Sequence, residues 1–92
     1  MTVPAHFVHI GFTFNGPAPI EALERTFSKA LDWMRYSQDC WILYTTTDSV
    51  TWRDRIHKTA GVSSDVAFFL VEFTGGEGYM HQWAWDWLNK AR

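Results

Sequence analysis

The sequence has a single cysteine and no long apolar run, and both deficits exclude classes of protein. With only Cys40 among 92 residues, an internal disulfide framework is impossible, and a reducing cytoplasm is the expected setting. No apolar run approaches the ~20 residues that a membrane-spanning helix needs. The beginning of the chain also lacks the basic and apolar regions of a signal peptide. We therefore expect a soluble cytoplasmic protein that has no membrane partner.

Neither sign of charge is in large excess. The formal net charge of −2 argues against a general nucleic-acid binder that relies on bulk electrostatics, although a local basic face stays open. Apolar residues are abundant: 47% of the chain is hydrophobic, 17% is aromatic, and six residues are Trp. This composition excludes disorder and predicts one domain over residues 1–92. Six tryptophans can hardly all be buried in one small core, so some should lie at a contact surface.

The most apolar run, residues 66–74, predicts a buried and central strand. β-branched and aromatic residues dominate this run, and the glycine-rich stretch 75–78 follows it, which favours a strand over a helix. Because side chains alternate along a strand, one face would carry Ala67, Phe69, Val71 and Phe73, and the other Val66, Phe68, Leu70, Glu72 and Thr74. Both faces would then need cover.

The remaining patterns predict three further strands and three helices. Alternation predicts a strand over residues 6–14, and apolar residues at helical spacing predict a helix from Ile20 to Met34. A short strand within 35–38 and a strand over 39–47 follow. A second helix would be capped by Asp48 or Ser49 and stopped by Gly61, with Val50, Trp52, Ile56 and Ala60 facing inward. A terminal helix is expected over 79–91.

This order is the β-α-β-β-α-β plan of an α+β, ferredoxin-like fold with an added C-terminal helix. Both long helices would pack on one face of an antiparallel sheet. The second face, expected to carry Phe68 and Leu70 with Phe7 and Trp41 as further candidates, must meet the terminal helix or another chain.

Residue types that could carry catalysis do not gather in a recognisable motif. His6 and His9 are three apart on a strand, so they point to opposite faces and cannot share a metal. His57 and His81 lie on separate helices, outside a His-Glu-x-x-His frame. The stretch 75–78 lacks the spacing of a phosphate-binding loop. We therefore expect a protein that is not an enzyme and that has no metal, cofactor or small-molecule substrate.

Two features remain as candidates for binding a partner. The apolar face expected on the terminal helix leaves Trp85 with His81 on the other side, and exposed Trp is enriched among binding hot spots. Folding of Trp85 against the glycine turn or Tyr79 is an equal alternative. The second feature is a basic set that suits a phosphate backbone or an acidic protein, with a solvated helix face as the alternative: Arg53, Arg55, Lys58, Arg35 and Lys29.

Several segments resemble, in order, the small bacterial Cas2-like, SinR-type proteins. The matching stretches are residues 12–15, 39–46 and 52–56, Asp65 with the strand that ends at residues 73–75, and residues 85–88. The resemblance implies the ferredoxin-like fold, dimerisation through sheets in many members, and contact with nucleic acid. Such proteins place an Asp at the end of the first strand, where paired copies bind a divalent metal. Here Thr13 stands there, and a neutral hydroxyl cannot supply the carboxylate's charge, so metal-dependent nuclease activity is not expected.

An aromatic-rich domain with this resemblance, but without that Asp, suits binding better than catalysis. We expect a phage anti-CRISPR protein, similar in size and character to inhibitors of type I complexes, that acts in the host bacterial cytoplasm. By occlusion, or by mimicry of RNA or DNA, it would block target DNA recognition by a multi-subunit CRISPR–Cas effector complex. Trp85 would anchor on protein, and the basic set would meet acidic surfaces or guide RNA. One alternative is a Cas2/SinR-like nucleic-acid-associated bacterial protein, with weak metal-dependent nuclease or toxin activity as one form of it, and another is a homodimeric structural module.

Overall fold

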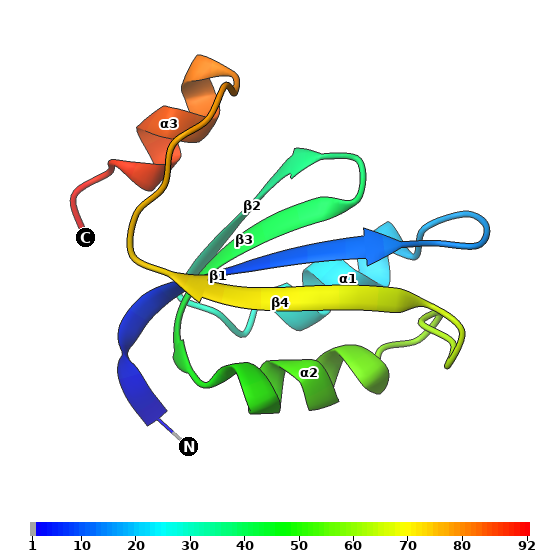
Figure 1. Cartoon of the computed structure of the whole chain (residues 1–92). Helices are drawn as coiled ribbons and strands as arrows, with labels where there is room; N and C mark the ends of the chain where they lie inside the picture. The colour runs from blue at the N-terminus through cyan, green and yellow to red at the C-terminus, as the bar shows by residue number, and fades with distance from the viewer. Residues whose placement is uncertain (1) are drawn as a thin grey trace.

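The computed structural model describes residues 2–92 of the chain. Its elements are, in order, β1 (Thr2–Thr13), α1 (Ile20–Phe27), β2 (Asp32–Ser37), β3 (Cys40–Thr47), α2 (Ser49–His57), β4 (Ala67–Phe73) and α3 (Gln82–Leu88). The four strands form one antiparallel sheet in the order β2-β3-β1-β4. Figure 1 shows α1 and α2 on one face of this sheet and α3 on the other. The protein therefore has the expected α+β character, with a four-stranded antiparallel sheet and three helices.

The main core lies between the sheet and the pair α1 and α2, on what we call the helix face. Alternating residues of β1 and β3 meet the apolar sides of both helices there, and the buried members are Val8, Ile10, Phe12, Leu23, Phe27, Trp41, Leu43, Trp52, Ile56 and Val62. The Trp52 indole Nε1 donates a hydrogen bond to Thr45 Oγ1 at 3.1 Å. Phe12 meets the Trp41 ring edge-on, with ring centroids 5.5 Å apart. Two of the six tryptophans are thus core residues.

The expectation that the most apolar strand is central was wrong, because β4 lies at the edge of the sheet. Within the described part of the chain it pairs only with β1, from Thr13 opposite Ala67 to Phe7 opposite Phe73. Its apolar run serves one covered face, where Phe68 and Leu70 pack on the main core. Phe69 and Val71, on the other face, are 69% and 42% exposed. Hydrophobicity reports burial of side chains, whereas the position in the sheet depends on which strands supply backbone partners.

The assignment of side chains to the second face was wrong in part. Phe68, Leu70 and Trp41 belong to the helix face. Phe7 does lie on the second face, where its ring stacks on Phe73 at 5.4 Å and meets Trp87 of α3 at 5.8 Å. Alternation divides the residues of a strand into two sets, but it cannot say which set the helices cover.

The first helix is shorter than its apolar spacing predicts. α1 ends at Phe27, and the chain tightens through a bond from Ala30 N–H to the Phe27 carbonyl at 2.9 Å. The Leu31 N–H then bonds to Tyr44 of β3. Met34, expected on the helix, is a buried residue of β2. The helical spacing across this segment therefore included residues of both α1 and β2, which bury different surfaces.

The predicted cap of the second helix is confirmed. Asp48 Oδ1 accepts a bond from the Thr51 N–H at 2.8 Å. Hydrogen bonding from the Thr51 side chain, and then from this N–H, holds the pKa of Asp48 below its usual value. Val50 and Ala60 were wrongly expected to face inward: Val50 is exposed, and Ala60 lies beyond the helix end at His57.

The chain turns after α2 at Gly61, whose φ is +86°. Only glycine adopts that conformation readily. A Cβ there would also lie 2.7 Å from Pro19, so the predicted stop has a tertiary reason as well as a local one.

The remaining bounds differ modestly from the predictions. β1 begins at Thr2 and β2 at Asp32, both earlier than expected, and β3 matches its predicted range to within one residue. α3 covers only Gln82–Leu88 of the expected 79–91. None of the helices among residues 2–92 is long and apolar enough to cross a membrane.

Candidate binding surfaces

The helix α3 is fastened across the second face by Arg92. The guanidinium donates to Asp32 Oδ2 at 2.9 Å through Nη1 and to the Trp87 carbonyl at 2.8 Å through Nη2. It also lies over the rings of Trp87 and Tyr44, at 4.4 and 4.7 Å from their centroids. The Arg92 side chain is only 12% exposed, although the residue as a whole lies at the surface, and it links β2, β3 and α3.

Fastening α3 in this way leaves a hollow between its N-terminal end and β2, which we call the α3 hollow. Its volume is about 470 Å³, and its lining residues are Tyr36, Ser37, Tyr79, Met80, His81 and Ala84. Tyr79 is fully exposed, and Trp83 beside the hollow is 49% exposed. The His81 ring stacks on Trp83 with centroids 6.1 Å apart. The structure thus places His81, a residue singled out from the sequence, at an aromatic surface.

The hydrogen-bonded pair of His9 and Tyr36 is uncharged near neutral pH. His9 Nε2 lies 2.5 Å from the Tyr36 hydroxyl. Partial burial lowers the pKa of His9. Burial, and then the neighbouring Cys40 thiol, raise the pKa of Tyr36 to about 12. Because the uncharged Tyr36 also lines the α3 hollow, the β2 side of the hollow carries no charge and suits an apolar ligand.

Trp85 lies away from the α3 hollow. It is half-buried and lines a smaller hollow of about 120 Å³ together with Phe73 and the glycine turn at Gly75 and Gly76. The fold-back alternative therefore describes its position. The exposed tryptophan of α3 is instead Trp83, which the helical pattern had assigned to the apolar face. Trp83 and Trp85 are the two sequence neighbours of the buried Ala84, so the sequence does not indicate which of these tryptophans is exposed.

The structure divides the predicted basic set. Lys29 and Lys58 come together with Arg25 around a hollow of about 270 Å³ between the C-terminal ends of α1 and α2, here called the basic hollow. The hydroxyls of Thr26 and Thr59, 2.8 Å apart, also line it. Arg25 was missed by the sequence analysis, although it lies four residues before Lys29 and thus on the same side of a helix. This hollow belongs to the helix layer, across the sheet from α3 (Figure 1).

The other predicted basic residues lie apart from the basic hollow. The Arg55 guanidinium lies over the Trp52 ring at 4.7 Å, and that of Arg35 lies over Trp41 at 5.3 Å. Both cover buried core rings, which gives them a structural role. Arg53 is exposed and lines a shallow hollow between α2 and β4.

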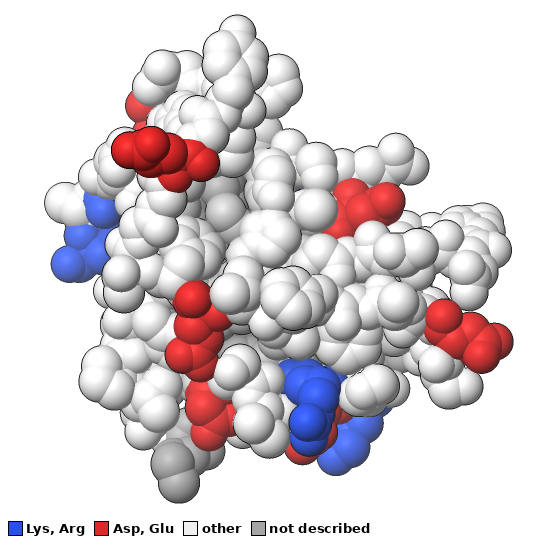
Figure 2. All heavy atoms as spheres, viewed as in Figure 1, with Lys and Arg blue, Asp and Glu red and all other residues white. Residues whose placement is uncertain are grey.

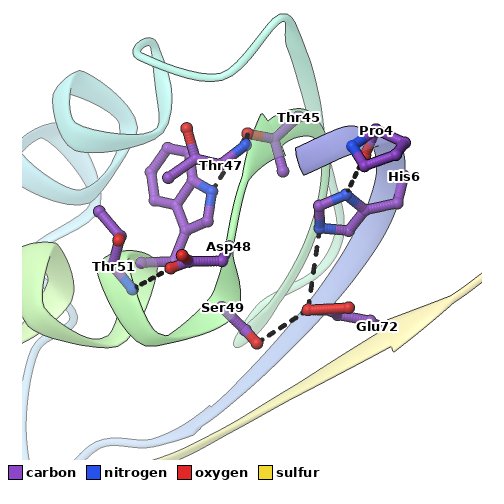
Figure 3. Close-up of polar contacts among 9 residues, drawn as sticks. Pro4, His6, Thr45, Thr47, Asp48, Ser49, Thr51 and Glu72 are labelled. Carbon is purple, nitrogen blue, oxygen red and sulfur yellow. Dashed lines mark hydrogen bonds and ion pairs between the residues drawn. The ribbon is translucent and has the colours of Figure 1, made fainter. Parts of the chain in front are cut away.

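Figure 3 shows a polar cluster that joins the beginning of β1 to α2 and β4. His6 Nδ1 lies 2.7 Å from the Pro4 carbonyl, and Nε2 lies 3.9 Å from Glu72 Oε2. The Ser49 hydroxyl donates to the same Glu72 oxygen at 2.9 Å. Serine catalysis needs the imidazole between the hydroxyl and the carboxylate, whereas here the carboxylate lies in the middle. The cluster is therefore arranged as a structural tie.

Possible metal ligands are also dispersed. Within residues 2–92, no three His, Cys, Asp or Glu side chains lie close enough together to hold a metal ion. Thr13, which was expected to end the first strand, is the last residue of β1.

Comparison with known proteins adds no assignment. No family model, curated protein or solved structure matches the chain. A function therefore has to be sought in the surfaces of the chain itself.

Proposed function

We propose that this protein works by binding a partner protein, and that the α3 hollow accepts an apolar side chain of that partner. The supporting observation is the hollow of about 470 Å³ beside the exposed rings of Tyr79 and Trp83. Tyrosine and tryptophan are enriched among residues that dominate interface affinity, and a methionine such as Met80 adapts its shape to a ligand. None of the described residues that line the hollow is Lys or Arg, which favours an apolar side chain over a phosphate.

We propose further that the fold is ferredoxin-like. The element order from β1 to β4 and the strand order β2-β3-β1-β4 support this. The strands joined by α1 have β3 between them, and the strands joined by α2 have β1 between them. Two such split units make the ferredoxin-like arrangement.

In its most specific form, the proposal is that the partner is a bacterial CRISPR–Cas surveillance complex and that the protein is a phage-encoded inhibitor. Occlusion of target DNA requires only a stable complex, so no catalytic group is needed. The aromatic residues at the α3 hollow would anchor on an effector subunit. The basic hollow on the opposite layer would remain available for acidic protein or guide RNA.

The test is capture of effector subunits by the tagged protein from bacterial lysate that contains an assembled complex, with and without ribonuclease. We expect stoichiometric capture. Because hot-spot aromatics dominate affinity, Trp83→Ala and Tyr79→Ala should each weaken it at least about tenfold. Leu31→Ala, which also truncates an exposed apolar side chain, is the matched control. No capture, or equal capture by all three variants, would reject the α3 hollow as the docking site.

A second candidate function, contact with a nucleic-acid backbone, is favoured by the convergence of Arg25, Lys29 and Lys58. Lysines that contact phosphates make affinity fall with salt by about 0.7 logarithmic units per contact on single strands. The double variant Lys29→Glu/Lys58→Glu should therefore lower the salt slope of RNA oligonucleotide binding by about 1.4. Fluorescence anisotropy measures this slope, with Arg53→Glu as the control outside the basic hollow. An unchanged slope would remove the basic hollow from consideration, and magnesium-dependent cleavage would favour the nuclease alternative.

A further inference from the structure

The α3 hollow adjoins a part of the second face that α1, α2 and α3 leave uncovered (Figure 1). Ser37 lines the hollow and pairs with Cys40 of β3, which in turn pairs with Gly11 of β1. Among residues 2–92, a Cβ at Gly11 would meet only the side chains of His9 and Cys40 within 4 Å. Phe69, opposite Gly11 on β4, is 69% exposed. The site therefore has room for a segment of a partner around the side chain that enters the hollow.

The segments that form the α3 hollow carry acidic residues and no basic ones. Residues 74–89 and 36–46 contain no Lys or Arg, and their acidic residues are Glu77, Asp86 and Asp39. Glu77 and Asp39 each lie two positions from a residue that lines the hollow. Asp86 lies three positions after the exposed tryptophan of α3, and thus on the same side of the helix. We call these three acidic residues the acidic rim.

The basic residues of the chain lie away from the acidic rim. Lys90 and Arg92 approach Asp32. The other six lie on the helix side of the sheet, and they are Arg25, Lys29, Arg35, Arg53, Arg55 and Lys58. Within residues 2–92, no Lys or Arg forms an ion pair with the acidic rim. Figure 2 shows acidic side chains on the lobe that contains α3 and again to its right, with uncharged surface between them. The carboxylates beside the hollow are therefore available to cations of a partner.

We infer that the α3 hollow recognises a partner segment in which Lys or Arg residues flank one apolar side chain. The inference rests on the proposed function, because it specifies the partner of the same site. The apolar side chain would enter the hollow, and the flanking cations would meet the acidic rim. Aromatic rings attract a neighbouring cation over their faces, so the exposed Tyr79 and Trp83 favour the same chemistry. Charges around an interface mainly set the association rate and the orientation, whereas aromatic anchors supply affinity.

The charges also distinguish this partner from others. A nucleic-acid backbone or an anionic membrane surface would bring negative charge against the acidic rim, which is unfavourable. An acidic protein segment would be repelled for the same reason. An apolar segment without charge would fill the hollow but leave the acidic rim without a partner. A basic segment with an apolar anchor satisfies both the uncharged hollow and the carboxylates beside it.

The test is selection of a displayed library of random short peptides on the immobilised full chain, with Trp83→Ala selected in parallel. We expect the peptides that are enriched on the parent and lost on Trp83→Ala to combine an apolar residue with several Lys or Arg. Fluorescence anisotropy then gives the dissociation constant of the most enriched peptide. This constant should rise at least tenfold for Asp39→Asn/Glu77→Gln/Asp86→Asn, and most of its salt dependence should disappear.

The matched control is Glu21→Gln/Asp54→Asn/Asp65→Asn, which removes three charges from exposed positions outside the acidic rim. It should leave the dissociation constant within about threefold of the parent, because distant surface charges are screened. Circular dichroism of each variant separates loss of binding from loss of fold.

Two failures are distinguishable. Peptides that need Trp83 but carry no Lys or Arg would overturn the inference and leave the α3 hollow as a docking site. Equal affinity of the parent and the acidic-rim variant for the enriched peptide would do the same. If no enriched peptide depends on Trp83, the hollow itself is rejected together with the inference.

Discussion

Replacing Trp52 with alanine is expected to lower the free energy of unfolding by about 3 to 5 kcal/mol, the usual cost of truncating a buried Trp. Trp52 is fully buried, packs near Phe27 with ring centroids 6.4 Å apart, and carries the Arg55 guanidinium on its outer side. Its loss leaves a cavity between α2 and the sheet that neighbouring helices can close only in part. A domain of this size has about 5 to 15 kcal/mol in total, so the variant should be marginal. Urea unfolding followed by circular dichroism measures the difference.

Two variants separate the sources of this loss. Trp52→Phe keeps most of the volume and removes the bond to Thr45 Oγ1, which should cost about 1 kcal/mol. Thr45 Oγ1 would still accept the Thr47 N–H at 3.1 Å. Trp83→Ala makes the same chemical change at a half-exposed site and should cost less than about 1 kcal/mol. Equal losses for Trp83→Ala and Trp52→Ala would contradict the placement of Trp52 in the core.

Replacing Arg92 with alanine is expected to release α3 from the second face, at a cost of about 2 to 3 kcal/mol for the loss of a charge-assisted bond, a second hydrogen bond and several ring contacts made by one side chain. The reason is that one side chain links Asp32, the Trp87 carbonyl and three aromatic rings. Hydrogen exchange of the α3 amides should accelerate about thirtyfold or more, while β1 and β3 stay protected. The α3 hollow would be lost with the helix, so capture of a partner should fail as well.

Lys90→Ala is the matched control, because Lys90 also approaches Asp32, at 3.5 Å, but from an exposed position. An exposed ion pair contributes at most about 1 kcal/mol. Faster exchange in Lys90→Ala than in Arg92→Ala would mean that α3 is not held by Arg92.

The same contact predicts a direction of pH dependence. Partial burial acts to raise the pKa of Asp32, but the hydrogen bond from Arg92, the Trp33 N–H and the charges of Lys90 and Arg92 outweigh it and lower the pKa. A carboxyl whose pKa is lower in the folded state contributes stability above its unfolded pKa and loses it as pH falls through the folded value. Attachment of α3 should therefore be constant near neutral pH and weaken below about pH 4. In Arg92→Ala this acid dependence should largely disappear.

How far local patterns predict the structure differs between elements. The cap at Asp48 was predictable because it depends on residues within one turn. The end of α1 was not predictable from local pattern. Leu31 and Met34 keep the helical spacing, but the Leu31 N–H bonds to β3 and Met34 belongs to β2. Of the candidate site, His81 was predicted from helix geometry, whereas Trp83 and Arg25 were missed. Whether Trp83 or Trp85 is exposed depends on the orientation in which α3 packs on the sheet. The basic hollow forms only where the C-terminal ends of α1 and α2 meet.

The sequence by itself determined the α+β class and the order of strands and helices along the chain. It also determined that the protein has more aromatic residues than one small core can bury. These follow from periodicity, turn residues and composition, which act over a few neighbouring positions. Only the tertiary structure decided that β4 is an edge, that α3 covers part of the second face, and that Phe69, Val71 and Trp83 stay exposed. Those outcomes depend on backbone partners and packing surfaces contributed by residues far apart in the chain, and no local pattern records them.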